Sequence, residues 1–413
     1  MDPGDAAWVL ASAALVLFMT PGLALFYGGM DRSRNVLNML MMNFWCLLII
    51  PIVWVAIGYT LAYSGTGSII GNFDWAFLKD LEITGDDGGR TLLSVAYLGM
   101  FAVITPALIS GAVADRIKFS AWAIFVPLWL VLVYCPVSFW VYGGVWNEDA
   151  TITGFLGERG SLDFAGGTVI HVNAGIAALA AVLVLGKRRH WPRDIEPPHS
   201  MPLVMLGTGI LWFGWFGFNA GSAFAANGVA IQAFLNTFLA AAAAGLTWAV
   251  VERIRDGHFT NLGAASGIVA GLVAITPAAG FVAGMSPIFI GAAAGLICCF
   301  AVRVKFKAGY DDSLDVVGVH FVGGLVGSLM IGLLAEPDFF AGTFKEGLFY
   351  GGGLELLGEQ LLANVVTIIW SFLLTFGILK ALDVTMGIRV SEEVEATGLD
   401  LAEHAETAYH GAA

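Results

Sequence analysis

Long apolar stretches, separated by short polar segments, run through almost the whole chain of 413 residues. Many of them reach the roughly 20 apolar residues that a helix needs to cross a bilayer. A segment inside lipid has to pair its own backbone polar groups, so these stretches are predicted to be helices. The short segments of alternating polarity that form membrane barrels do not occur in this sequence. The pattern therefore predicts an all-α, polytopic membrane protein.

Eleven membrane-spanning helices are predicted from the apolar stretches. They cover residues 6–28, 37–63, 91–113, 119–146, 165–186, 202–221, 229–251, 259–277, 282–302, 314–335 and 355–386. The fourth and the last are long enough to tilt or to extend beyond the lipid. The first stretch begins directly after Asp5, without a basic segment or a cleavage site, so we expect a span and not a cleaved signal peptide.

Composition supports the same class. Hydrophobic residues make up 58% of the chain, charged residues 12%, and the mean hydropathy is +0.81. The four cysteines lie inside apolar stretches and have neither metal-ligand spacing nor support for disulfide pairing. The net charge of −13 is concentrated in two loops and the C-terminal tail. This charge is explained equally well by ordinary solvated loops and by an acidic outer face that attracts cations.

Basic residues predict the orientation. One set of loops carries thirteen Lys and Arg residues, and the opposite set carries Lys79, Arg90, Arg159 and Lys345. Because cytoplasmic loops are enriched in Lys and Arg, the first set is predicted to be cytoplasmic. The N-terminus then lies outside and the C-terminus inside, which agrees with an odd number of spans.

An inverted repeat is predicted within the transmembrane domain, residues 1–388. Ala114-Asp-Arg-Ile-Lys-Phe119 after span three resembles Val251-Glu-Arg-Ile-Arg255 in the second half. Repeat A covers about 6–186 and repeat B about 202–335, followed by the last helix and by a cytoplasmic tail, 389–413. Such a repeat places a binding site near the membrane midplane, between the halves.

Two histidines lie at corresponding places in these halves. His171 begins span five, eight residues after Asp163, and His320 begins span ten, five residues after Asp315. Ionisable side chains inside spans are costly and usually face a cavity or one another. A lone histidine in a span can be a satisfied core residue, but a symmetric pair favours a functional role. Glycines near both histidines allow their helices to approach closely.

Five motifs in matching order carry a resemblance to a known family. They are Pro21-Gly-Leu-Ala-Leu-Phe-Tyr-Gly-Gly29, Asp163-Phe-Ala-Gly-Gly-Thr-Val-Ile-His171, Gly214-Trp-Phe-Gly-Phe-Asn-Ala-Gly-Ser222, Ile275-Thr-Pro-Ala278 and Asp315-Val-Val-Gly-Val-His320. The chain resembles the ammonium transporter family (Amt/Mep/Rh), on its Amt branch, over nearly its whole length. The resemblance implies a homotrimer in the cell (plasma or inner) membrane, with a separate narrow pore through each subunit and no cofactor, metal or nucleic acid.

The resemblance also implies roles for individual residues. His171 and His320 resemble the twin histidines of the pore, and Phe101 and Phe218 the phenyl gate above them. The resemblance further assigns Tyr142, Ser222, Phe101 and Asp163 to an external ammonium site, and Trp215 and Thr276 to the pore lining. Without the motif, the aromatic residues would be ordinary core residues, and Thr276 can equally make contacts between helices.

One position departs from the family pattern. The external site usually contains a tryptophan where this chain has Tyr142, in Pro136-Val-Ser-Phe-Trp-Val-Tyr-Gly-Gly144. Trp140 lies about 200° around the helix and is not expected to replace it. A tyrosine offers a cation–π face weaker than that of tryptophan and adds a hydroxyl group.

The implied function is electrogenic ammonium transport, with methylammonium as an analogue. Moving a cation into an apolar pore is expensive, whereas neutral ammonia crosses cheaply. Imidazole, with an ordinary pKa near 6.5, is suited to handle the released proton. Asp163 can cap its helix or act directly on the cation or proton, and Asp315 is predicted to be a structural, capping acid. The alternatives are an electroneutral ammonia or CO2 channel of Rh type and an ammonium sensor. No enzyme motif is evident.

The tail that follows Arg389 contains Glu392-Glu393 and Gly398-Leu-Asp400. It resembles the family's cytoplasmic tail, which contacts neighbouring subunits and a PII-type signal protein. A solvated, disordered end is the alternative interpretation. The resemblance therefore predicts regulation at the cytoplasmic face, but the sequence does not identify the partner.

Overall fold

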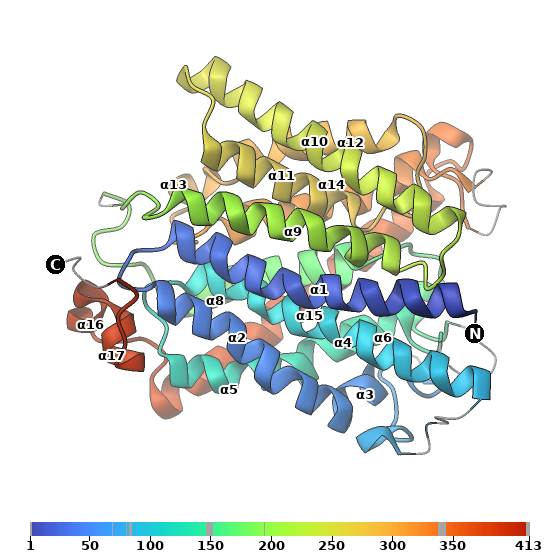
Figure 1. The fold of residues 1–413 in the computed structure, drawn as a ribbon, viewed down its shortest axis with the longest axis horizontal. Helices are drawn as coiled ribbons and strands as arrows, with labels where there is room; N and C mark the ends of the chain where they lie inside the picture. Colours follow the sequence, from blue (N-terminus) through green and yellow to red (C-terminus); the bar gives the residue numbers. More distant parts are fainter. Residues whose placement is uncertain are drawn as a thin grey trace.

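The computed structural model describes residues 2–67, 69–79, 81, 85–145, 152–193, 195–337 and 344–409. Within these ranges the chain is helical, and its β-structure consists of an isolated bridge between Ile117 and Arg389. Residue 146 of the predicted fourth span and residues 410–413 of the predicted tail lie outside the described ranges. The helices form a bundle with the two chain ends at opposite ends of it (Figure 1).

The first half of the chain supplies five long membrane-type segments. They are α1 (Pro3–Met30), α2 (Val36–Val53) with a π turn (Trp54–Gly58) and α3 (Tyr59–Tyr63), α4 (Gly85–Val113), α5 (Phe119–Trp129) with a π turn (Leu130–Tyr134) and α6 (Cys135–Tyr142), and a π turn (Gly167–Val172) with α8 (Asn173–Leu185). Shorter elements are a 3-10 turn (Ala76–Leu78) and α7 (Phe155–Glu158).

The second half repeats this order and adds a last helix and the tail. Its elements are α9 (Met201–Gly221), α10 (Gly228–Asp256), α11 (Asn261–Ile275), α12 (Ser286–Ala301), α13 (Val304–Ala308), a π turn (Val317–Phe321) with α14 (Val322–Leu334), a 3-10 turn (Leu348–Tyr350), α15 (Glu355–Met386), α16 (Glu392–Thr397) and α17 (Leu399–His404).

The predicted all-α class and the order of the spans are confirmed. Ten helices in the described ranges are long and apolar enough to cross a membrane. The eighth predicted span, 259–277, corresponds to α11, an apolar helix of 15 residues. At 1.5 Å per residue it is only about 22 Å long. It packs inside the bundle, where Ala265, Ala270 and Val273 are fully buried.

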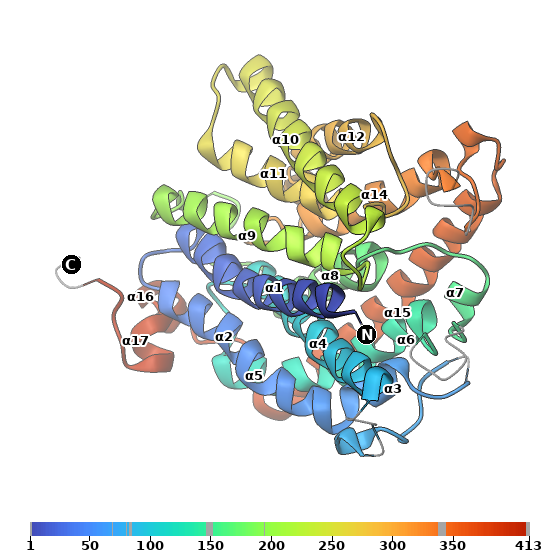
Figure 2. The same ribbon diagram turned by 45° about the vertical axis from the view of Figure 1, so that its right-hand side comes forward.

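Antiparallel contacts between the two halves support the predicted inverted repeat. The indole nitrogen of Trp8, near the start of α1, donates to the carbonyl of Ala220 at the end of α9 (3.2 Å). At the other end, the amide of Ser200, just before α9, donates to the carbonyl of Gly29 (3.1 Å). The first helices of the two halves therefore run in opposite directions along each other, as both ribbon views show (Figures 1 and 2).

The fifth and tenth spans cross at the centre of the bundle. The hydroxyl groups of Thr168 and Ser328 are 3.3 Å apart on one side of the crossing, and Gly175 meets Phe321 on the other side. A Cβ atom on Gly175 would lie 2.4 Å from the backbone nitrogen of Phe321, so only glycine allows this approach. Both spans begin with a π turn, a feature common at functional sites.

The prediction that Asp315 caps span ten is wrong. The cap is Asp312, whose carboxylate accepts the backbone N–H groups of Val316 (3.1 Å) and Val317 (2.7 Å). Asp315 instead forms an ion pair with Lys305 (2.7 Å). Asp312 precedes His320 by eight residues, the same spacing that separates Asp163 from His171. Asp312, and not Asp315, is therefore the counterpart of Asp163.

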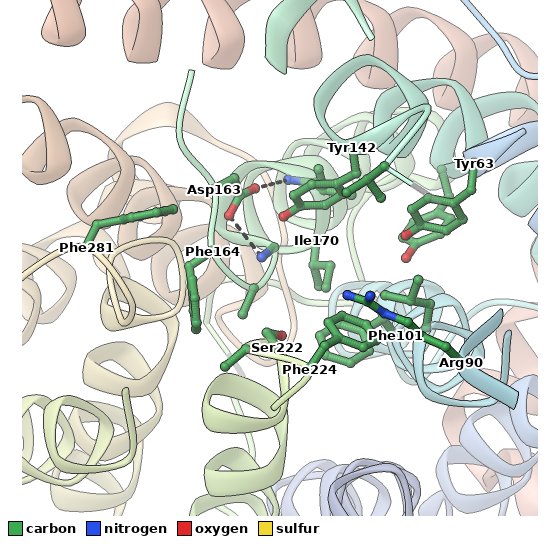
Figure 3. A pocket seen from close by; sticks show the side chains of 17 residues that line it. Tyr63, Arg90, Phe101, Tyr142, Asp163, Phe164, Ile170, Ser222, Phe224 and Phe281 are labelled. Carbon is green, nitrogen blue, oxygen red and sulfur yellow. Dashed lines mark hydrogen bonds between the residues drawn. The ribbon is translucent and has the colours of Figure 1, made fainter. Parts of the chain in front are cut away.

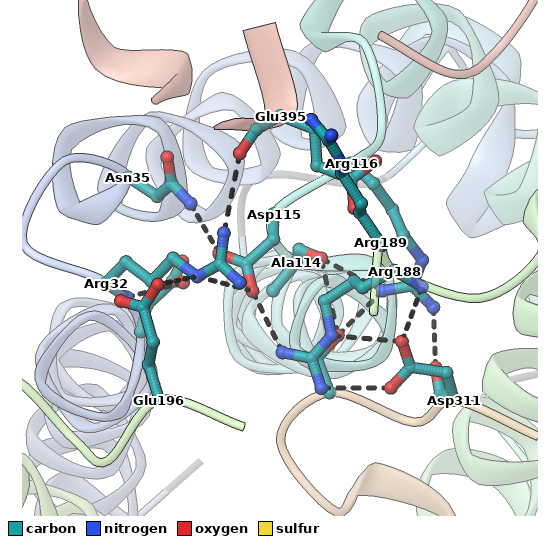
Figure 4. A network of polar contacts seen from close by, with 12 residues as sticks. Arg32, Asn35, Ala114, Asp115, Arg116, Arg188, Arg189, Glu196, Asp311 and Glu395 are labelled. Atoms are coloured by element: carbon teal, nitrogen blue, oxygen red, sulfur yellow. Dashed lines mark hydrogen bonds and ion pairs between the residues drawn. The ribbon is translucent and has the colours of Figure 1, made fainter. Parts of the chain in front are cut away.

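A polar network ties the two halves together at the end of the bundle that carries the C-terminus (Figure 4). Arg188, after α8, bonds with Asp115 (2.9 Å) from the first half and with Asp311 (2.9 and 3.0 Å) from the second. Burial by itself disfavours the charged carboxylate of Asp311, but hydrogen bonds and the positive charges of Arg188 and Arg116 lower its pKa. Ion pairs this well satisfied fix the relative position of the loops that they join.

The tail docks on this network. The carboxylate of Glu395 accepts the backbone N–H of Arg189 (2.6 Å) and pairs with Arg389 (2.7 Å). The carboxylate of Asp400 accepts the backbone N–H groups of Leu37 (3.1 Å) and Asn38 (2.8 Å), at the start of α2. An acid at a helix N-terminus is stabilising. Residues 395–400 are therefore ordered against the bundle, which excludes a wholly disordered tail.

Candidate functional site

A cavity of about 390 Å³, here called the vestibule, contains the residues of the predicted external site. Phe101, Tyr142, Asp163 and Ser222 all line it (Figure 3). Its wall is rich in aromatic residues that the sequence analysis did not single out. They are Tyr63, Tyr134, Phe164, Phe224 and Phe281.

Asp163 lies at the wall of the vestibule and caps the π turn that starts span five. Its carboxylate accepts four backbone N–H groups at 2.6–3.0 Å, and its exposed fraction is 7%. Gly166 makes this loop possible, because its φ of +106° suits glycine. The carboxylate can therefore stay charged while buried, and its field extends into the vestibule.

Tyr142 supplies an acceptor that is not used by the protein. In Figure 3 its hydroxyl is directed towards Asp163. No described residue donates a hydrogen bond to the hydroxyl oxygen, and as a donor the group faces the carboxylate of Asp163. The hydroxyl of Ser222, by contrast, donates to the carbonyl of Phe218 (2.9 Å). Tyr142 therefore has more spare hydrogen-bonding capacity than Ser222.

Two stacked phenyl rings form the floor of the vestibule. The ring centroids of Phe101 and Phe218 are 4.2 Å apart with an interplanar angle of 30°. Tyr97, one helical turn before Phe101, holds the pair, because its hydroxyl lies 2.8 Å from the carbonyl oxygens of both Gly217 and Phe218. The sequence analysis missed Tyr97, although its position four residues before Phe101 places it on the same face of α4.

Below the phenyl pair lies a narrow inner cavity of about 10 Å³. Both histidines line it. The remaining lining residues are apolar or aromatic: Met19, Leu23, Ile104, Leu108, Leu211, Trp215, Phe218 and Val269. A space of this size holds about one water molecule, and apolar walls give such a molecule few partners. The inner cavity therefore suits a small neutral molecule better than a hydrated ion.

His171 and His320 face each other across this cavity. Their Nδ1 atoms are 3.3 Å apart, and both side chains are at most 2% exposed. Trp215 stacks on His171 with ring centroids 5.4 Å apart. The indole nitrogen of Trp215 donates to the hydroxyl of Thr276 (2.8 Å), so Thr276 makes a contact between helices that positions the indole.

One pair of tautomers satisfies both contacts of the Tyr27 hydroxyl group. The hydroxyl of Tyr27 donates to the carbonyl of Leu108 (3.2 Å), which leaves its oxygen to accept from Nε2 of His320 (3.5 Å). Neutral His320 then carries its proton on Nε2 and accepts at Nδ1 from His171. Nε2 of His171 is consequently an acceptor, and it has no partner in the described structure. Tyr27 was not identified as a site residue from the sequence.

Comparisons with known proteins show which family the chain resembles. Residues 7–409 match the sequence profile of the Ammonium Transporter Family. A protein of Mycobacterium tuberculosis (strain H37Rv) named Ammonium transporter is 49% identical, over 99% of this chain and 90% of the relative. Ammonium transporter Amt1 of Archaeoglobus fulgidus is 43% identical, over 99% of this chain and 100% of the relative.

Solved structures show the same fold. Mep2 of Candida albicans superimposes with a TM-score of 0.87 and 35% identity, covering 95% of this chain and 87% of the other. A structure titled Sensor Amt Protein superimposes with a TM-score of 0.90 and 29% identity, covering 97% of this chain and 98% of the other.

Proposed function

Because the chain belongs to the Ammonium Transporter Family, and so transports or conducts ammonium or ammonia and is not an enzyme, we propose an electrogenic mechanism for it. Ammonium binds in the vestibule and loses a proton there. Ammonia crosses the inner cavity past His171 and His320, while the proton moves separately. One net charge therefore accompanies each molecule that crosses.

The vestibule is suited to capture a small cation. Aromatic faces attract cations, and Phe101 and Tyr142 present such faces. The hydroxyl oxygen of Tyr142, to which no described residue donates, accepts one of the four N–H donors of ammonium. The buried charge of Asp163 adds electrostatic attraction without direct contact, since its oxygens are already occupied by backbone N–H groups. Potassium can also lie against this oxygen, but it forms no directional N–H bond, and one oxygen replaces a smaller part of its larger coordination shell than of the four N–H contacts of ammonium.

The phenyl pair and the inner cavity favour passage of the neutral form. Stacked rings 4.2 Å apart leave no room for a hydration shell. An unpaired ion in a low-dielectric interior costs several kcal/mol. Deprotonation before the phenyl pair avoids that cost. The vestibule, where solvent still has access, is therefore the place where the proton leaves.

Nε2 of His171 receives the ammonia. With the tautomers given above, this atom carries a free lone pair. His171 lines the inner cavity together with Phe218 and Trp215. Ammonia donates one N–H to Nε2. A proton arriving at Nε2 by way of water makes Nδ1 of His171 release its own proton to Nδ1 of His320, 3.3 Å away, and His320 then releases its Nε2 proton towards the oxygen of Tyr27 and on to water. The pair thus relays a proton along a path that a potassium ion cannot use.

The contact between the two Nδ1 atoms, in an apolar cavity behind stacked phenyl rings, is the observation that carries the proposal. Currents recorded on a solid-supported membrane test it, using purified protein in liposomes and a jump in ammonium concentration. We expect positive charge to move inward with the ammonium gradient. Uptake of labelled methylammonium without any charge movement would instead support the electroneutral channel.

We also propose the finer organisation implied by the family resemblance. The protein is a homotrimer in the cell membrane, with its N-terminus outside, and its tail takes part in regulation by a PII-type protein. The excess of Lys and Arg at the end that carries the tail supports this orientation. The docking of Glu395 on the loop after α8 and of Asp400 on the start of α2 supports a regulatory tail, because a change in the tail is transmitted directly to these segments.

A further inference from the structure

The last helix, α15, contacts the segment 162–168, here called the Asp163 loop. The side-chain amide of Gln360, on α15, forms a two-way contact with the backbone of Leu162, directly before Asp163. Its Oε1 atom accepts the N–H of Leu162 (2.6 Å), and its Nε2 atom donates to the carbonyl of Leu162 (2.8 Å). Gln360 is 1% exposed, so water does not compete for these bonds. A side chain of the last helix therefore fixes the backbone at the start of the loop.

A second carboxamide of α15 holds the other end of the Asp163 loop. Asn364 lies about one helical turn after Gln360, and its Oδ1 atom accepts the hydroxyl of Thr168 (3.2 Å). The backbone N–H of Thr168 is one of the four that bind the carboxylate of Asp163 (2.9 Å). Gln360 and Asn364 thus hold the chain on both sides of Asp163, although neither of them lines the vestibule.

Both N–H donors of each carboxamide are used. Nε2 of Gln360 also contacts the carbonyl and hydroxyl oxygens of Ser328 on α14 (both 3.1 Å). Nδ2 of Asn364 donates to the hydroxyl of Ser328 (2.8 Å) and to the carbonyl of Gln360 (2.7 Å). Turning the amide of Gln360 over would place its N–H groups against the N–H of Leu162. Because a buried donor without an acceptor is strongly destabilising, the network fixes one orientation of this amide.

The corresponding segment in the second half is held by charged groups instead. Asp311, directly before the cap Asp312, accepts a bond from Arg116 at its carbonyl (2.5 Å) and pairs with Arg188 (2.9 Å). A positive charge next to Asp163 would weaken the attraction that its carboxylate is proposed to exert on ammonium. A neutral carboxamide holds the loop without adding such a charge.

We propose that Gln360 and Asn364 are positioning residues that hold the charge of Asp163 at the vestibule wall and so set the affinity for ammonium. Asp163 acts on the cation through its charge, and the strength of such an interaction depends on the distance between the charges. A loop released from α15 lets the carboxylate move away from the cation. The attraction then weakens, while the pore below the phenyl pair is unchanged. This inference rests on the proposed ammonium-binding function of the vestibule.

Gln360→Met and Thr168→Val test the proposal in ammonium-jump currents on liposomes. Methionine has nearly the shape of glutamine but cannot bond to Leu162, and valine lacks the hydroxyl that Thr168 donates to Asn364. Each variant should raise KM for ammonium by about two- to fivefold, the scale expected when a charge contact lengthens by about 1–2 Å. The saturating current per folded protein should not change. Thr168→Val is the milder change and provides the test if Gln360→Met does not fold.

Ser371→Ala is the matched control on the same helix. Ser371 is fully buried, and its hydroxyl donates to the carbonyl of Asn173 on α8 (2.9 Å), outside the Asp163 loop. Thermal unfolding should show that this variant is destabilised, as Thr168→Val is, because each loses a buried hydrogen bond. A looser α15 reduces the amount of folded protein and hence the total current. The KM of Ser371→Ala should therefore equal that of the wild type.

A double variant tests whether Gln360 acts through Asp163. Asp163→Asn removes the charge, so the position of this side chain no longer affects the cation electrostatically. Gln360→Met should raise KM no further in the Asp163→Asn background. A further rise of the same size as in the wild-type background would overturn the route through Asp163.

The outcomes separate this inference from the proposed function. Absence of ammonium-dependent flux in the wild-type protein would refute the proposed function itself. Normal wild-type flux with an unchanged KM in the folded Gln360→Met and Thr168→Val variants would refute only the role of α15. An equal rise of KM in Ser371→Ala would show a general effect of loosening this helix and would also refute it.

Discussion

Replacing Tyr142 with phenylalanine removes one oxygen atom from the vestibule and leaves the aromatic ring in place. No described residue donates a hydrogen bond to that oxygen, whereas the carboxylate oxygens of Asp163 accept two N–H groups each. Ammonium has four N–H donors and needs acceptors to replace the water that it loses. The substitution therefore tests whether the departure from the family's usual tryptophan contributes to ammonium binding.

The expected size of the effect follows from this single contact. A hydrogen bond to a charged group contributes about 1.5–3 kcal/mol. Water that remains in the open vestibule replaces part of it, so we expect a net loss of about 1 kcal/mol, which is about a fivefold increase in KM for ammonium. The saturating current should not change. Inhibition by potassium, for which this oxygen would be only one of several coordinating ligands, should change less.

Tyr63→Phe is the matched control for this substitution. Tyr63 also lines the vestibule, but its hydroxyl oxygen already accepts a hydrogen bond from Ser138 (3.1 Å). We expect its KM to stay within about twofold of the wild type, since an engaged oxygen gives ammonium little. Ammonium-jump currents measured over a range of concentrations give both constants. If Tyr142→Phe left KM unchanged, the tyrosine hydroxyl would not be part of the ammonium site.

Two further predictions concern the scaffold. Gly175→Ala places a methyl group 2.4 Å from the backbone of Phe321 and should separate spans five and ten. We expect the free energy of unfolding to fall by about 2 kcal/mol or more and most transport to be lost, as measured by thermal unfolding and ammonium currents. Wild-type stability and transport in this variant would refute the close-packing argument. The pKa of Asp311 is lowered in the folded protein, so its stabilising contribution is present above the ordinary pKa, about 3.9, and is lost as pH falls through the folded value. The Asp311→Asn variant should therefore be less stable than the wild type near neutral pH, and it should lose less stability than the wild type when the pH falls below about 4. A variant with the same dependence of stability on pH as the wild type would contradict this.

Hydropathy predicted the spans because burial in lipid demands continuous apolar helices, but it located their ends less well. Arg90 was placed in a loop because the apolar stretch starts at residue 91, whereas α4 begins at Gly85. Hydropathy marks only the apolar part of a helix, so it does not locate an end that lies beyond the apolar stretch. The eighth span is a second case, because its apolar stretch was predicted to cover 259–277, whereas α11 runs only over Asn261–Ile275.

The site was predicted in part. Motifs led to the histidines and the phenyl pair, and the structure brings these residues together. The equal eight-residue spacing of Asp163 and Asp312 from their histidines was the signal that would have corrected the assignment of Asp315. Tyr27 lies in the first of the five motifs, but nothing in the sequence links it to His320, because their contact joins residues 293 positions apart. Contacts of this kind depend on how helices pack and are not encoded in local spacing.

The central claim is that the histidine pair lets a proton pass and excludes other cations. The most direct measurement compares currents evoked by ammonium and by potassium in the wild type and in His171→Asp. A carboxylate in place of the imidazole attracts water and cations into the inner cavity, so this variant should keep part of the ammonium current and gain a potassium current that the wild type lacks. A His171→Asp protein that carries ammonium and still rejects potassium as the wild type does would contradict the account.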